Sequence, residues 1–125
     1  MDNPRSARNL LVIDDDPTIL EYLRRALGAR GYSVATADSV DHAFDLLSSP
    51  TMRVDMIICD VVMPRRDGFA LHDALNSLLN PIPVIFITGA PAKIIEAQLR
   101  RPPVSILPKP IELDVLDQAI QRALA

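Results

Sequence analysis

The feature that most limits the possible folds is an alternation of short apolar runs with longer helix-like segments, which continues along the whole chain. Each apolar run has the length and composition of a strand that is buried on both faces. The predicted strands are Leu10–Asp14, Ser33–Ala37, Val54–Cys59, Pro83–Ile87 and Val104–Leu107. Strands and helices that alternate in this way favour a parallel sheet with right-handed crossovers. We therefore expect a doubly wound (βα)5, flavodoxin-like α/β fold with strand order 2-1-3-4-5 and helices on both faces.

Helix boundary signals support this pattern. Asp16 and Pro17 suit the cap and first position of a helix that runs to about Ala29, with Gly31 as its stop. Ser39 is the predicted cap of a second helix that ends near Pro50. Later helices are predicted for the segment containing Phe69, Leu71, Leu75, Leu78 and Leu79, for Ala92–Arg100 and for Glu112–Leu124. Asp16 is thus expected to cap a helix, not to take part in chemistry.

Length and composition limit the classes of protein. The 125 residues are expected to form one domain, 10–125, after a polar extension, 1–9, which has no apolar core of a signal peptide. No apolar run is long enough to cross a membrane. The net charge is −3 and the basic residues are scattered, which argues against direct nucleic-acid binding. Cys59 is the only cysteine and is expected to be a buried apolar residue. These features predict a cytoplasmic protein.

Reactive side chains lie at the ends of the predicted strands. Asp14 and Asp15 end the first, Asp60 follows the third, Thr88 follows the fourth, and Lys109 comes shortly after the fifth. In the expected strand order, the first and third strands are neighbours at the switch point where ligands bind. Clustered carboxylates repel each other, and a hard cation such as Mg²⁺, which prefers oxygen ligands, would offset that repulsion.

Four short motifs give the chain a specific resemblance. They are the acidic pair in VIDDDP, the aspartate in ICDVVMPRRDG, the threonine in FITGA and the lysine in LPKP. In this order and spacing, the motifs resemble those of the receiver domains of two-component response regulators. The resemblance covers nearly the whole chain.

The resemblance implies a metal site and a phosphoacceptor. Asp14 and Asp15 would hold Mg²⁺, with Mn²⁺ as a substitute, together with Asp60 and the backbone carbonyl of Val62. Asp60 would also be the nucleophile that accepts the phosphoryl group. The chain would then be a signalling switch and not an enzyme that turns over a separate substrate.

The resemblance also implies roles for two further side chains. Lys109 would neutralise charge on the transferred phosphoryl oxygens, and the Thr88 hydroxyl would donate to one of them and pull the following loop. The bond between Lys109 and Pro110 corresponds to one that is commonly cis in the family.

The implied partner is a sensor histidine kinase or a histidine phosphotransfer protein. The sequence leaves open the identity of the output, whether the chain stands alone or begins a longer regulator, and whether it is a monomer or a weak, phosphorylation-dependent dimer. Arg65 and Arg66 follow the predicted phosphoacceptor and are candidates for partner docking, although exposed loop charges are the simpler interpretation.

Some positions depart from the common receiver pattern. Ile106 stands where many receivers have an aromatic switch residue, RRPPVS replaces the usual Gly-Ala before the last strand, and Gly89 follows Thr88 where Ala is common. Val62 and Ala90 occupy the positions that tune dephosphorylation in this family, and neither can position an attacking water. We therefore expect a phosphoryl state that lasts for minutes or longer.

Two alternatives remain at this stage. LLVIDDDPT also fits the opening motif of haloacid-dehalogenase-type phosphatases, with Asp14 as nucleophile and Asp16 as general acid, but this leaves Asp60 without a role. The second alternative is a receiver fold that serves only as an interaction module. It is disfavoured because the chain keeps every expected site residue.

Overall fold

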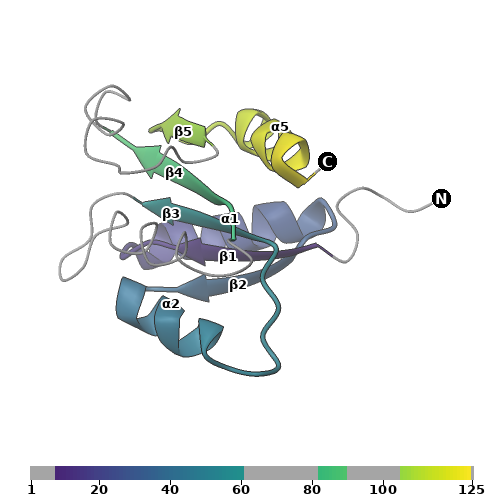
Figure 1. Ribbon diagram of the computed structural model, residues 1–125. Helices are drawn as coiled ribbons and strands as arrows, with labels where there is room; N and C mark the ends of the chain where they lie inside the picture. The colour runs from purple at the N-terminus through teal and green to yellow at the C-terminus, as the bar shows by residue number, and fades with distance from the viewer. Residues whose placement is uncertain (1–7, 61–81, 90–104, 125) are drawn as a thin grey trace.

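In a computed structural model, which describes residues 8–60, 82–89 and 105–124, the chain forms one five-stranded parallel sheet with the order β2-β1-β3-β4-β5. The strands are β1 (Asn9–Ile13), β2 (Ser33–Ala37), β3 (Met56–Asp60), β4 (Val84–Thr88) and β5 (Ser105–Pro108). The helices are α1 (Pro17–Ala29), α2 (Val40–Leu47) and α5 (Leu113–Leu124). Figure 1 shows this arrangement. The predicted fold class and strand order are confirmed.

The strand limits differ from the predicted ones by one or two residues. Asp60 pairs in register with Ile87, and Thr88 pairs with Pro108, so these polar residues end their strands instead of following them. At the other edge, β1 begins at Asn9, one residue inside the predicted extension. The main chain continues to pair after the apolar run has ended, because ladder hydrogen bonds do not require apolar side chains. The two helices predicted around Phe69–Leu79 and Ala92–Arg100 lie outside the described residues.

Each face of the sheet is covered by helices. Leu10, Val12 and other side chains on one face pack against Leu23 and Leu27 of α1 and Leu116 of α5. On the opposite face, Leu11, Ile57 and Phe86 belong to the cluster that α2 covers. The strands are therefore buried on both sides, as their continuous apolar sequences predicted. None of the helices in this described part of the chain has the length and hydropathy needed to cross a bilayer.

Side-chain caps begin the first two helices where the sequence predicted them. The Asp16 carboxylate accepts a hydrogen bond from the Thr18 amide at 2.9 Å, which satisfies one of the free donors at the start of α1. Ser39 does the same for the His42 amide at 3.0 Å in α2. The α2 helix ends at Leu47, earlier than predicted, where the Ser48 hydroxyl donates to the Phe44 carbonyl. Such a bond satisfies one of the last free carbonyls.

Candidate functional site

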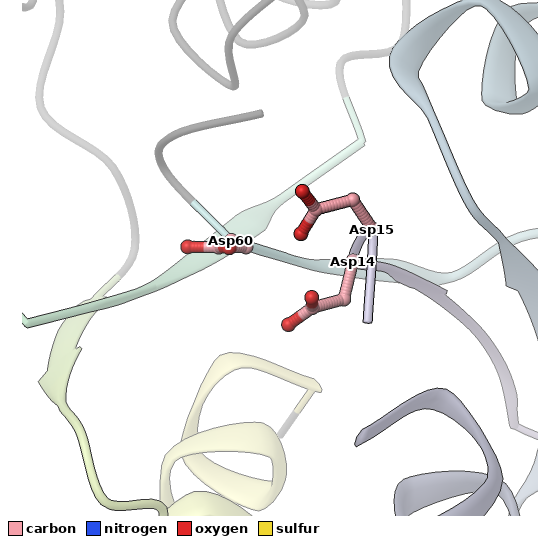
Figure 2. A group of neighbouring side chains, drawn as sticks. All are labelled: Asp14, Asp15 and Asp60. Atoms are coloured by element: carbon pink, nitrogen blue, oxygen red, sulfur yellow. The ribbon is translucent and has the colours of Figure 1, made fainter. Parts of the chain in front are cut away.

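Three carboxylates meet at the carboxyl edge of the sheet. Ile13 at the end of β1 pairs with Cys59 of β3, so the residues that follow them, Asp14 and Asp60, come to the same place. One carboxylate oxygen from each of Asp14, Asp15 and Asp60 lies within 4.8 Å of the others. Figure 2 shows the three side chains gathered at the ends of these two strands. Strand order alone has brought together residues that are more than forty positions apart.

Lys109 completes the charged group. Its ammonium nitrogen lies 3.3 Å from an Asp60 carboxylate oxygen, and the aspartate side chain is far less exposed than the lysine. The Lys109 amide donates to the Thr88 carbonyl at 2.8 Å, which fixes the start of the β5–α5 connection beside the end of β4. The bond from Lys109 to Pro110 is cis, as the resemblance led us to expect. In the part of the chain that the structure describes, one ammonium group, that of Lys109, thus lies beside three carboxylates.

Thr88 lies at the same edge of the sheet, as the last residue of β4, between β3 and β5. It is buried. The structure thus places Thr88 on the strand next to the one that ends at Asp60.

Burial makes this acidic group costly. The Asp14 side chain is only 5% exposed, and its pKa is raised from 3.8 to about 6, chiefly by desolvation. The negative charges of Asp60 and Asp15 also act to raise this pKa, whereas the Asp16 amide, which donates to Asp14 at 2.9 Å, and the charge of Lys109 act to lower it. A buried carboxyl with a raised pKa and two acidic neighbours fits a site for a divalent cation. Its donors are the hard oxygens that Mg²⁺ prefers.

The three acids belong to the lining of a cavity of about 540 Å³. The cavity is lined by Asp14, Asp15, Asp16, Ile19, Tyr22, Asp60, Lys109, Pro110 and Ile111. Its apolar side, formed by Ile19 and Tyr22 of α1 with Pro110 and Ile111, was not foreseen from the sequence. The available signal was spacing, since Ile19 and Tyr22 lie four and seven positions after Asp15 and so share one side of the helix. Tyr22 is 48% exposed, which is unusual for a large aromatic side chain.

Other residues singled out in the sequence are accounted for in part. Cys59 is fully buried, and its thiol donates to the Asp60 carbonyl at 3.1 Å, as a small buried residue can. Ile106 is partly buried and packs against the cluster under α2. Val62, Ala90, Arg65 and Arg66 lie outside the described residues, so the predicted carbonyl ligand and the dephosphorylation-tuning positions stay predictions.

A comparison with known families decides which family the chain belongs to. The model of the response regulator receiver domain matches residues 10–121. The chain belongs to the response regulator receiver family. It is therefore a receiver domain of two-component signalling, and the phosphatase alternative is set aside.

Relatives and a solved structure agree with this assignment. Response regulator MprA of Mycolicibacterium vanbaalenii is 40% identical over 80 residues, which are 64% of the receiver and 34% of MprA. Transcriptional regulatory protein GlrR of Escherichia coli is 36% identical over 119 residues, which are 93% of the receiver and 26% of GlrR. A receiver domain protein from Clostridium thermocellum has a TM-score of 0.84 at 26% identity, over 94% of each chain. The receiver thus spans about a third or less of these curated relatives.

Proposed function

We propose that this receiver takes a phosphoryl group onto Asp60 from a sensor histidine kinase or a histidine phosphotransfer protein in the cytoplasm. The observation that carries the proposal is the position of Asp60, which has two further carboxylates within 4.8 Å and the Lys109 ammonium at 3.3 Å. A nucleophilic carboxylate beside a metal-binding group and an ammonium group suits phosphoryl transfer, in which positioning and charge stabilisation do most of the work.

The transfer would proceed by attack of an Asp60 carboxylate oxygen on phosphorus. The new bond joins that oxygen to phosphorus, and the bond from phosphorus to the donor histidine nitrogen breaks. The electron pair of the broken bond stays on that nitrogen, and the imidazole, which carries a proton on its other ring nitrogen, leaves as a neutral ring. Lys109 lies close enough to Asp60 to balance charge on the transferred oxygens. Thr88, at the end of the neighbouring strand, offers a hydroxyl that can donate to one of them.

Mg²⁺, or Mn²⁺ in its place, would be held by Asp14, Asp15 and Asp60, with the Val62 carbonyl as a further ligand. When bound, the cation supplies positive charge that offsets the clustered carboxylates and the incoming phosphoryl oxygens. The raised pKa of Asp14 supports this proposal, because that carboxyl is held at an energetic cost that a cation would remove. Asp16 is not among the proposed metal ligands, because its carboxylate caps α1.

The residues that line the cavity support a protein, and not a small molecule, as the phosphoryl donor. Ile19, Tyr22, Pro110 and Ile111 form an apolar rim beside the acids, and a small donor would leave this rim in contact with water. An apolar side chain next to the donor histidine would cover it. Donation from Thr88 to the bound phosphoryl group would then bias the loop after β4 toward a second state that an output domain or partner reads.

The direct test is incubation with phosphoramidate, a small donor with a phosphorus–nitrogen bond, in the presence of Mg²⁺. Intact mass followed by peptide mapping should find one phosphoryl group on Asp60. We expect no label without a divalent cation and none in Asp60→Asn. Asp38→Asn, which changes an aspartate outside the metal group, serves as the matched control and should be labelled normally. Label on Asp14, or steady release of phosphate, would contradict the proposal. No label together with no Mg²⁺ binding would leave the interaction module.

A further inference from the structure

A second charged group lies far from Asp60, on α5. Asp117 is only 2% exposed and occupies a position in the apolar stripe of the helix, next to Leu116 and Ile120, where an uncharged residue is expected. Its carboxylate accepts hydrogen bonds from the Tyr32 hydroxyl at 2.6 Å and from the Arg30 guanidinium at 2.9 Å. A buried carboxylate keeps its charge at little cost only while such donors stay in place.

Arg30 contacts two residues of α5 that lie one helical turn apart. One terminal nitrogen binds Asp117, and the other binds Asp114, one turn earlier, at 2.7 Å. Two acids spaced by three residues lie on the same side of a helix, so one planar guanidinium can bridge them. Arg30 thereby joins α5 to a segment more than eighty positions away in the sequence.

Arg30 and Tyr32, which donate to Asp117, lie in a tight turn. Arg30 caps α1, and the amides of Arg30 and Tyr32 both donate to the Leu27 carbonyl, at 3.0 and 3.2 Å. Between them Gly31 has a φ of 103°, a conformation that side chains other than glycine's rarely allow. The connection from α1 to β2 is thus a tight, hydrogen-bonded turn, and Tyr32 is buried in the core behind it.

The two ends of α5 are held differently. At the C-terminal end, Arg8 donates to the Leu124 carbonyl at 3.3 Å, while its own carbonyl accepts from Ser33 at the start of β2. At the other end, Glu112 and Val115 line a small cavity of about 130 Å³ together with Pro110 and Ile111, and Val115 is 43% exposed. Figure 1 shows that the C-terminal end of α5 lies at the edge of the sheet where β1 begins.

We infer that Arg30, Tyr32, Asp114 and Asp117 form a clamp that keeps α5 stationary when the phosphorylation site changes state. Displacing the helix would separate Asp117 from Arg30 and Tyr32, which belong to the turn between α1 and β2, although the Gln121 amide of α5, at 3.1 Å, would move with it. The network therefore favours one position of α5. Between β5 and α5, structural change is then confined to the connection at Lys109–Glu112. The clamp has this role only if Asp60 is phosphorylated, as we propose.

Hydrogen exchange with and without beryllofluoride, a stable mimic of the phosphoryl group, tests the clamp in the presence of Mg²⁺. In the unaltered chain, beryllofluoride should change the exchange rates of the amides of residues 117–124 by less than about two-fold. In Arg30→Gln, which removes both ion pairs but leaves Tyr32 to donate to Asp117, the same addition should change them by about ten-fold or more. Arg24→Gln, which removes an exposed arginine of α1, is the matched control and should behave like the unaltered chain.

Two results would overturn the clamp, and a third would overturn the proposed function on which it rests. A ten-fold change in residues 117–124 of the unaltered chain would show that α5 moves, and this measurement requires no variant to fold. Equal, small changes in the unaltered chain and in both Arg30→Gln and Tyr32→Phe would show that the helix is stationary for another reason. If beryllofluoride gave no rise in thermal stability and no change in exchange anywhere, the proposed function itself would fail. That outcome is distinguishable from the first two.

Discussion

Replacing Asp14 with asparagine should stabilise the receiver when no divalent cation is bound. Burial and the neighbouring acids raise the pKa of Asp14 from 3.8 to about 6, so its charged form is disfavoured in the folded state. A shift of about two pH units corresponds to about 3 kcal/mol, at about 1.4 kcal/mol per unit. Because Asp15 is exposed and Lys109 partly so, water screens the site, and we expect a gain in unfolding free energy of about 1–2 kcal/mol at neutral pH.

The gain in unfolding free energy of Asp14→Asn should depend on pH. Below about pH 4 the carboxyl is protonated in both folded and unfolded chains, so the asparagine variant should gain nothing there. Between about pH 4 and 6 the unfolded chain loses its proton first, which destabilises the folded state of the unaltered protein progressively. The advantage of Asp14→Asn should therefore grow across this range and stay constant above it. The variant keeps the oxygen that accepts from the Asp16 amide.

Urea unfolding at a series of pH values, with chelator and with Mg²⁺, is the appropriate assay. Added Mg²⁺ should stabilise the unaltered protein more than the variant, because a ligand that binds only the folded state raises its stability. Asp45→Asn, which neutralises an exposed aspartate of α2, is the matched control and should change stability by less than about 0.5 kcal/mol. A variant no more stable than the unaltered protein at neutral pH, or a gain that persists unchanged below pH 4, would refute the reasoning.

Two further predictions follow from residues near the site. Asp16→Ala removes the cap on α1 and should lower the unfolding free energy by about 1 kcal/mol, while labelling of Asp60 by phosphoramidate changes less than two-fold. Asp16→Ser, which keeps a capping oxygen, is its control, and loss of labelling would mean that Asp16 belongs to the metal site. Because Val62 and Ala90 carry no group that could position water, the phosphoryl group on Asp60 should persist for minutes or longer in purified protein. Intact mass of samples quenched over time measures this lifetime, and loss within seconds in the absence of a phosphatase would contradict it.

The apolar runs and helix caps were readable from the sequence because they are local. Five short runs without polar interruption predict strands buried on both faces, and Asp16 and Ser39 mark the helix starts where the structure has them. The strand ends were less predictable. Asp60 and Thr88 continue the ladder by main-chain hydrogen bonds, to which side-chain polarity gives no guide.

The roles of some acidic residues could be predicted from the sequence, whereas that of Asp117 could not. Asp14, Asp15 and Asp60 could be grouped because each comes at the end of a predicted strand and the strand order makes those ends neighbours. Asp117 has no such signal. It lies at an apolar position of an amphipathic helix, and its donors Arg30 and Tyr32 come from a turn more than eighty residues earlier.

The sequence alone was enough to predict the order of the described strands and helices and the carboxylates that meet at the ends of β1 and β3, because periodicity, caps and strand ends are properties of neighbouring residues. The tertiary structure decided the rest. It placed Lys109 3.3 Å from Asp60, put Ile19 and Tyr22 beside the acids, and buried Asp117 against Tyr32. These contacts depend on how helices settle on the two faces of a twisted sheet, and packing of this kind joins residues that have no relation along the chain.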